Sequence, residues 1–485
     1  MATTMTPAPA PARTDQSSDQ AADELIPNDL VREAVPSPAG PAEAQDMDLP
    51  EPPRVPLPRG VQVMHMNWRQ IEFMFRWQRR LGDVFRANAI VAGGPTVTSH
   101  PEHVKSLFTA NPDIAPSLTA ESPLLPIVGP GSVLTANGPR HLRQRRLLLP
   151  PFHGEAIERY TRMISEATER EIERWPVGTP FALAPRTQSI TLDVIMSGIL
   201  GVEGKPQRGT PEYGLRAAVK YLAAASTLPL YQLAELLNLG HEEPVGIQKR
   251  GIQILDKYTY GVIKARRQVT DLEDRTDILS LIMRARTEDG EPLTDRELRD
   301  ELLTLILAGF ETTANSMAWT WERLTRTPEA YDRLRDAVRS DDHADEHIEA
   351  AIVEAMRVRP VIPAIGRRVT VPWRLGDYTV PAGTPVIMSI LLVHHREDLY
   401  PDPFAYRPER WLGRKPGTYE WIPFGGGTRR CLGATLAMAE QRVVMDAMVR
   451  RLDLEAADPA PEHVNHRNVT MIPKRGARVI VRSRH

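Results

Sequence analysis

The chain of 485 residues has little of several things that would define its class. It holds a single cysteine, Cys431, which excludes an internal disulfide framework and fits a reducing compartment. No run of about 18 apolar residues predicts a membrane-spanning helix, and residues 1–13 have no apolar core of a signal peptide. The formal net charge of −2 gives no sign of nucleic-acid binding. We therefore expect a soluble, cytoplasmic protein without an integral membrane anchor.

The beginning of the chain also lacks apolar and aromatic side chains. Residues 1–52 are rich in Ala, Pro, Asp, Glu, Gln and Ser, and such a segment cannot bury enough apolar surface to become ordered. We expect a disordered Ala/Pro-rich tail over residues 1–52. Residues 53–485 are compatible with one large helical domain.

The lone cysteine lies in an unusual local sequence. Three glycines at 425–427 allow a tight turn with positive φ angles, and the cysteine follows Arg429 and Arg430 directly. The apolar run 432–438 predicts a helix after the turn. A cysteine at a helix start beside cations is expected to have a lowered pKa and to be a thiolate, hence a nucleophile or a metal ligand. A buried, inert cysteine is the alternative.

The neighbours of this cysteine complete the pattern F-x-x-G-x-R-x-C-x-G, whose fixed positions are filled by Phe424, Gly427, Arg429, Cys431 and Gly433. The stretch resembles the haem-binding loop of the cytochrome P-450 superfamily, the haem-thiolate monooxygenases, of the soluble bacterial type. The resemblance implies a mainly α fold with small β-sheets. It implies a single domain with haem b between a central long helix and the cysteine loop.

The same resemblance assigns a role to each fixed position of the loop. Cys431 would be the axial thiolate ligand of the haem iron. Arg429 would bind a haem propionate, because a planar guanidinium suits a carboxylate. Phe424 would lie near the sulfur, while Gly427 and Gly433 would let the backbone approach the haem closely.

A second segment combines residues that are unfavourable in a buried helix. A capping box at 294–297 predicts the helix start, and the apolar residues 302–307 predict that the helix is buried. Its middle, 308–313, reads Ala-Gly-Phe-Glu-Thr-Thr. Gly309 costs about 1 kcal/mol relative to alanine in a helix, and a buried Glu311 costs more unless it is paired or protonated. Such choices favour a functional site; a local bend is the alternative.

This segment resembles the oxygen-activation motif of the same superfamily. By that resemblance Ala308 and Gly309 would border the haem, and Gly309 would let a ligand or water approach the backbone. Thr312 would hydrogen-bond the bound dioxygen and Glu311 would feed protons toward it. This acid–alcohol pair favours oxygen chemistry over mere haem storage.

Further cations match propionate-binding positions of the superfamily. His141 and Arg145 are four residues apart on a predicted helix and share one face; a solvated basic face is the alternative. Arg367 matches another propionate-binding arginine, with its neighbour Arg368 as the alternative.

Glu354, Arg357 and Arg410 match a buried ionic triad of the superfamily, with the first two spaced E-x-x-R on a predicted helix. Breaking one member of such a group costs about 3–5 kcal/mol. We expect the triad to fix the chain segment that leads to the cysteine loop.

Three other regions are expected around the substrate. Residues 117–137 are predicted as a long loop, and the resemblance to the superfamily places a substrate-covering lid at residues 213–239. The stretches 469–472 and 477–481 are expected to form a hairpin whose tip reaches the pocket.

We therefore expect an oxidoreductase, a cytochrome P-450 monooxygenase that activates O2 and hydroxylates or epoxidises an apolar organic substrate. A ferredoxin and a ferredoxin reductase would deliver electrons from NAD(P)H, because no such domain is fused to the chain. A monomer is expected. A non-catalytic haem-thiolate sensor and a peroxide-driven enzyme are the alternatives, and both could dispense with the acid–alcohol pair.

Overall fold

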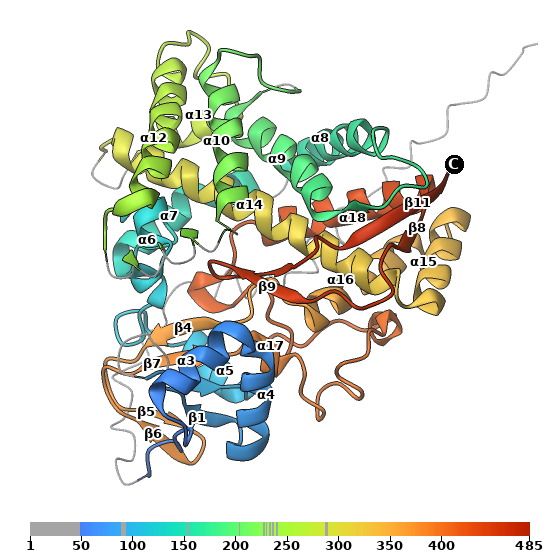
Figure 1. Ribbon diagram of the computed structural model, residues 1–485. Coiled ribbons are helices and arrows are strands. Elements are labelled where there is room, and N and C mark those ends of the chain that lie inside the picture. Colours follow the sequence, from blue (N-terminus) through green and yellow to red (C-terminus); the bar gives the residue numbers. More distant parts are fainter. Residues whose placement is uncertain are drawn as a thin grey trace, which may run out of the picture. The chain divides into compact units, whose positions relative to one another are not determined.

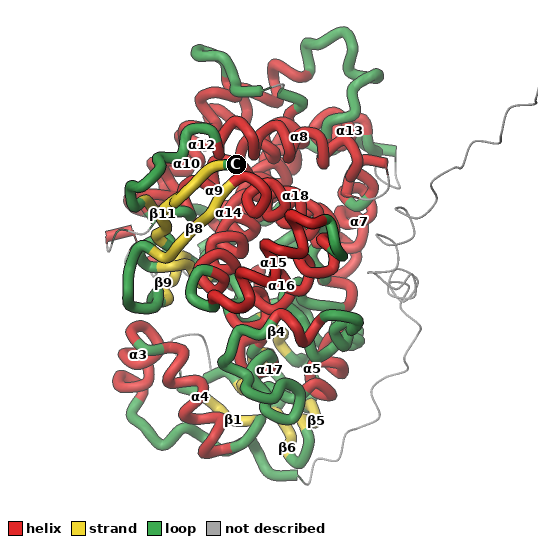
Figure 2. Tube along the Cα trace, turned by 90° about the vertical axis from the view of Figure 1, so that its right-hand side faces the viewer, coloured by secondary structure: helices red, strands yellow, loops and turns green. Residues whose placement is uncertain are grey.

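The structure, a computed structural model, describes residues 49–88, 94–152, 155–202, 204–226, 241–286 and 290–485, with 228, 230, 231, 234, 237 and 238 between them. Nearly all of the expected tail, 1–52, therefore lies outside the described residues. The described part is mainly helical with small sheets, as expected (Figures 1 and 2). No helix within these ranges combines the length and apolar character needed to cross a bilayer.

The helices follow one another along most of the chain. They are α3 (Arg59–Trp68), α4 (Gln70–Leu81), α5 (Pro101–Phe108), α6 (Leu125–Val128), α7 (Gly138–Leu148), α8 (Glu155–Ile172), α9 (Ala184–Leu200), α10 (Pro211–Ala225), α12 (Gly246–Arg266), α13 (Ile278–Arg284), α14 (Asp295–Leu324), α15 (Pro328–Ser340), α16 (Ala344–Val358), α17 (Ile390–Val393) and α18 (Ala434–Arg451).

The strands form small separate sheets. One has the order β1 (Val84–Arg86), β2 (Thr96–Thr98), β7 (Pro385–Met388), β4 (Ile365–Arg368), and only its β2–β7 pair is parallel. A second has the order β3 (Phe181–Ala182), β11 (Arg478–Arg484), β8 (Leu452–Ala456). The remaining pairs are β5 (Trp373–Leu375) with β6 (Tyr378–Val380), and β9 (Val464–Arg467) with β10 (Thr470–Pro473).

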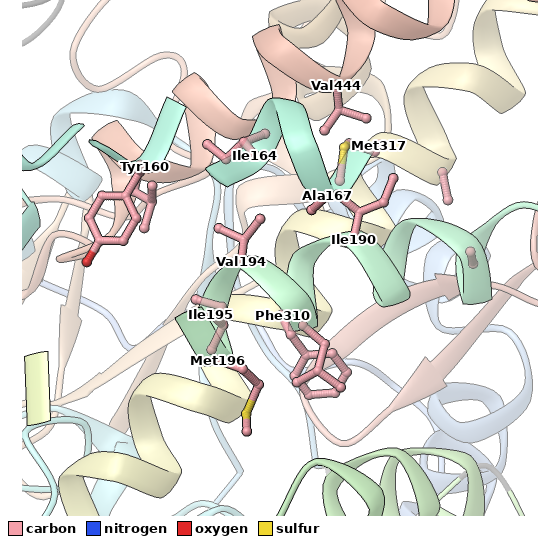
Figure 3. Close-up of a cluster of buried hydrophobic side chains, with 14 of the residues drawn as sticks. Tyr160, Ile164, Ala167, Ile190, Val194, Ile195, Met196, Phe310, Met317 and Val444 are labelled. Atoms are coloured by element: carbon pink, nitrogen blue, oxygen red, sulfur yellow. The ribbon is translucent and has the colours of Figure 1, made fainter. Parts of the chain in front are cut away.

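The long helix α14 is the centre of the fold (Figure 1). The predicted capping box between Thr294 and Glu297 starts it, and it runs for 30 residues. Helices α8, α9 and α18 join it in one large apolar cluster, part of which is drawn in Figure 3. Phe310 on α14 and Ile195 on α9 both belong to this cluster. A helix covered by neighbours on most sides explains why its sequence is apolar nearly all round.

The prediction that residues 469–472 pair with residues 477–481 in a hairpin is wrong. Residues 470–473 form β10, which pairs with β9, whereas β11 pairs with β8 and β3. Thr470 lies opposite Arg467, so Asn468 and Val469 form a two-residue turn. Asn468 has a φ of 49°, and such turns favour asparagine because it tolerates left-handed backbone.

The predicted loop at residues 117–137 is more ordered than expected. Residues 117–137 contain a 3-10 turn, Leu118–Glu121, and helix α6. The lid region 213–239 begins with most of α10, but many of its later residues, including Leu233 and Leu236, lie outside the described part.

Candidate active site

The cysteine loop is pressed closely against helix α5. Gly425 and Gly427 have φ angles of 69° and 61°, which side chains rarely adopt. A Cβ at Gly427 would lie 2.1 Å from the carbonyl oxygen of Phe108. The Cys431 N–H donates to the carbonyl oxygen of Phe424 at 2.9 Å and closes the loop. The glycines are therefore required by this backbone fold.

Cys431 lies two residues before Gly433, the N-cap of α18. Its side chain has accessible surface, yet it is surrounded by protein deeply enough that burial dominates its pKa. A sulfur that faces an internal space accounts for both its accessible surface and its deep surroundings. Burial raises the pKa of the thiol, while the Gly433 N–H and the Arg145 and Arg430 guanidinium groups oppose this rise. The predicted lowering is therefore wrong for the chain alone, because desolvation outweighs the cations.

The middle of α14 has accessible surface in a helix that is otherwise buried. Residues 302–306 and 313–322 are buried, whereas Ala308 is exposed and its neighbours are partly exposed. The Thr312 hydroxyl donates to the carbonyl oxygen of Ala308 at 2.6 Å. This backbone bond holds the threonine side chain along the accessible turn.

Gly309 has a packing reason that the sequence did not show. A Cβ there would lie 2.4 Å from Cδ1 of Ile195 on α9. The glycine thus lets α9 and α14 approach closely. The expected approach of a ligand to its backbone is not needed to explain it.

Glu311 is held by a residue that the sequence analysis missed. Its Oε1 lies 3.0 Å from Nη1 of Arg467 on β9 and accepts a bond from the Thr470 hydroxyl at 3.4 Å. Burial raises the pKa of Glu311, and Arg467 and Thr470 lower it. Nothing in the local sequence around either residue indicates this contact.

Four predicted cations gather near the cysteine loop: His141 and Arg145 on α7, Arg367 on β4 and Arg429 in the loop. Burial and the three arginines lower the pKa of His141 to about 3, so it is neutral. Burial lowers the pKa of Arg367 to about 10 and, with its arginine neighbours, that of Arg429 to about 9. Among the described residues, no carboxylate lies within 4.0 Å of these three arginines.

The choice between Arg367 and Arg368 follows from strand alternation. Arg367 is buried and lies near His141 and Arg429. Arg368 points the other way, and its Nε donates to Glu121 at 2.8 Å. Only Arg367 belongs to the cationic cluster.

Arg429 also holds the segment before α7. Its guanidinium donates to the carbonyl oxygens of Val133, Leu134 and Ala136 and to the side chain of Asn137. The sequence indicates a propionate partner for Arg429 and does not reveal these bonds. The Arg429 side chain therefore attaches residues 133–137 to the cysteine loop.

The same segment is attached to α14 by three successive residues. The N–H groups of 131 and 133 donate to Asp300 at 2.8 Å and to Glu301 at 3.0 Å, and the hydroxyl of residue 132 lies 2.6 Å from that of Thr304. All of these groups are buried. The acids 300 and 301 were not singled out in the sequence, where they look like ordinary helix residues.

The structure brings Glu354, Arg357 and Arg410 together. Both carboxylate oxygens of Glu354 accept bonds from Arg357 at 2.8 Å, and Arg410 Nε donates at 3.2 Å. The Trp411 indole donates to the same carboxylate at 2.9 Å. Arg357 also donates to the carbonyl oxygen of Pro403 at 2.7 Å. These bonds fix the segment 403–411 to helix α16.

The site fits the haem b that the sequence implied. Nothing lies within 4 Å of a Cβ built on Gly433, whose φ of −89° is open to any residue. The protein alone therefore does not require glycine beside the sulfur, whereas a flat group over the thiol would. Arg367, which is buried, and the partly buried Arg145 and Arg429 have no carboxylate nearby in the described part of the chain, and they suit the two anionic propionates of such a group.

Comparison with known proteins agrees with this fit. The family model described as Cytochrome P450 matches residues 50–481. The chain is 36% identical over 441 residues to cytochrome P450 135B1 of Mycobacterium bovis, covering 90% of this chain and 92% of the relative. It is 35% identical to cytochrome P450 137 of Mycobacterium tuberculosis, with 88% and 90% covered.

Solved structures show the same fold. The retinoic acid-bound cyanobacterial CYP120A1 superposes with a TM-score of 0.75 at 22% identity, covering 90% of this chain and 100% of that one. The cytochrome P450 CYP102L1 gives a TM-score of 0.74 at 21% identity, with the same coverage. The chain belongs to the cytochrome P450 family.

Proposed function

We propose that this cytochrome P450 hydroxylates or epoxidises an apolar organic substrate, with NAD(P)H-derived electrons delivered by a ferredoxin and its reductase. Family membership itself makes the protein a haem b-dependent oxidoreductase of the monooxygenase class. When bound, the haem supplies the chemistry of oxygen activation. The chain's own residues hold it, supply protons and position the substrate.

The observation that carries the site assignment is the accessible Cys431 thiol beside Arg145, Arg367 and Arg429, which have no carboxylate partner among the described residues. Cys431 is the proposed iron ligand, and binding to the metal would favour its thiolate form against the effect of burial. Arg145, Arg367 and Arg429 are proposed to hold the propionates, because partly or fully buried guanidinium groups are stabilised by an anion. His141, neutral in this setting, is proposed to donate a hydrogen bond there.

Thr312 and Glu311 are the proposed catalytic pair. The Thr312 hydroxyl lies on the accessible turn of α14, and rotation away from the Ala308 carbonyl would free it to bond another group there. Glu311, one residue earlier, accepts and releases protons that an apolar pocket does not supply. The apolar Leu124 and Leu125, both partly exposed at α6, are consistent with an apolar substrate.

Exposed arginines on α7 favour an acidic protein as the electron donor. Helix α7 exposes Arg140 and Arg146, and the same helix carries Arg145, whose Nη1 donates to the carbonyl oxygen of Arg430 at 2.6 Å. Exposed positive charge on the helix that contacts the cysteine loop would attract an acidic partner and speed its encounter. Binding of ferredoxin that weakens with rising salt is expected.

Two variants test the proposal. Cys431→Ala should abolish the thiolate Soret band of the reduced, carbon-monoxide-bound protein, while Thr428→Ala in the same loop should retain it. Retention of the band in Cys431→Ala refutes the ligand assignment. A screen of binding spectra with fatty acids, terpenoids, steroids and macrolides then identifies the substrate class.

Thr312→Ala should release more peroxide at the expense of product, because the hydroxyl on the accessible turn is lost. Thr313→Ala is the matched control, since the neighbouring Thr313 is buried. Equal coupling in the two variants contradicts the role of Thr312 and favours a non-catalytic or peroxide-driven protein.

A further inference from the structure

The Glu311 side chain contacts the hairpin formed by β9 and β10 and is mostly shielded from solvent. Its side chain is 14% exposed and that of Arg467 is 10% exposed. The contact joins α14 to the last residue of β9, 156 positions further along the chain. A proton donor on the central helix is therefore in contact with a cation from a separate element.

The hairpin that carries Arg467 is firmly attached behind this contact. The Trp319 indole, two turns along α14, donates to the carbonyl oxygen of Met471 at 3.1 Å. The Met471 N–H in turn donates to the carbonyl oxygen of Val361 at 2.7 Å. Val469 at the tip is 36% exposed, although it is apolar. Arg467 thus lies on a hairpin that is attached through Met471 and whose turn at Val469 is accessible.

The ion pair between Arg467 and Glu311 uses a single nitrogen of the guanidinium group. Arg467 reaches Glu311 through Nη1 alone, and its Nε is buried with no hydrogen-bond partner among the described residues. A two-pronged arginine–carboxylate contact would be stronger and more rigid. A one-pronged contact stabilises the carboxylate while leaving it able to move.

Two opposing influences act on this carboxyl group. Burial raises the pKa of Glu311, and the charge of Arg467 and the bonds from Arg467 and Thr470 lower it. Without the arginine, burial would keep the acid protonated, and a proton that is held tightly is released slowly. The arginine therefore decides how readily Glu311 gives up its proton.

We propose that Arg467 is a positioning residue for the proton donor: it stabilises the Glu311 carboxylate after each proton is delivered. In each cycle the acid releases one proton to the reacting site and becomes a carboxylate paired with Arg467. A proton from bulk water then restores the acid. The inference rests on the proposed role of Glu311.

The test uses the haem-loaded protein with its electron donors. Arg467→Met should lower turnover by about tenfold, less than the roughly 10²-fold cost of losing an acid–base group, and shift its pH optimum. Arg467→Lys, which keeps a cation, should recover much of the rate. The matched control is Arg478→Met, because Arg478 pairs with Asp458 at 3.1 Å on β11 and lies away from Glu311.

A second readout does not depend on activity. Infrared difference spectra between Arg467→Met and the Arg467→Met/Glu311→Gln double variant should show a protonated carboxyl band at neutral pH. The corresponding wild-type difference should show a weaker protonated band, because the charge of Arg467 favours the carboxylate. Absence of the protonated band together with wild-type coupling in Arg467→Met overturns the inference.

The outcomes separate the two proposals. If Glu311→Gln leaves coupling unchanged, the proposed role of Glu311 fails. If Glu311→Gln uncouples the reaction while Arg467→Met matches the Arg478→Met control in rate and pH profile, only the role of Arg467 fails.

Discussion

Glu301→Gln tests how residues 131–133, at the start of the segment that Arg429 holds, are attached to α14. Glu301 is 1% exposed, and its Oε1 accepts the Val133 N–H at 3.0 Å. Its Oε2 is buried and has no partner among the described residues. Burial raises the pKa of Glu301 from 4.5 to about 8. Glutamine keeps an acceptor for the Val133 N–H and never ionises.

The sign and size of the effect follow from proton linkage. Between pH 4.5 and about 8 the folded protein retains the Glu301 proton and the unfolded chain has lost it. The contribution of Glu301 to the free energy of unfolding is therefore highest below 4.5 and falls as pH rises toward 8. At about 1.36 kcal/mol per pKa unit, the loss reaches roughly 4–5 kcal/mol. Glu301→Gln should remove this slope and be the more stable protein at the alkaline end.

Denaturant midpoints of the wild type and Glu301→Gln, taken from about pH 5 to about pH 8 across the expected titration, measure the difference. Glu329→Gln is the control, since Glu329 is exposed in the first turn of α15. Amide exchange at Gly131 and Val133 reports whether the segment opens before the whole fold does. If Glu301→Gln retains the wild-type slope, or is destabilised at every pH, the reasoning is wrong.

Two further predictions concern packing and the triad. Glu354→Ala should lower the free energy of unfolding by about 3–5 kcal/mol because buried charges lose their partner, and Arg410→Ala, at the partly exposed rim, should cost less; urea midpoints that reverse this order contradict it. Gly309→Ala should cost about 1–3 kcal/mol by displacing Ile195, whereas Gly433→Ala should fold normally and bind haem weakly, as thermal melts and haem titration will show.

The features that the sequence predicted are local ones. The capping box at Thr294, the glycine turn before Cys431 and the shared face of His141 and Arg145 each depend on residues within a few positions of one another. Periodicity and capping act over such distances. The helical fold with small sheets was accessible for the same reason, with the family resemblance supplying the arrangement.

The features that it missed depend on contacts between distant segments. The partner of Glu311 lies on β9, and the reason for Gly309 lies on α9. The thiol pKa of Cys431 depends on how deeply the folded chain surrounds it, and neighbouring charges predicted the wrong direction. Strand β10 pairs with β9 because of a turn at Asn468 that the apolar pattern did not reveal.

The bonds from Arg429 to the segment 133–137 have a consequence for how the cofactor is kept. That segment is also tied to α14 through Glu301, so it spans from the central helix to the cysteine loop. If Arg429 holds a propionate as proposed, we expect haem release to require that this tie open at the cysteine loop. Variants at Arg429 should then lose haem faster and bind it less tightly.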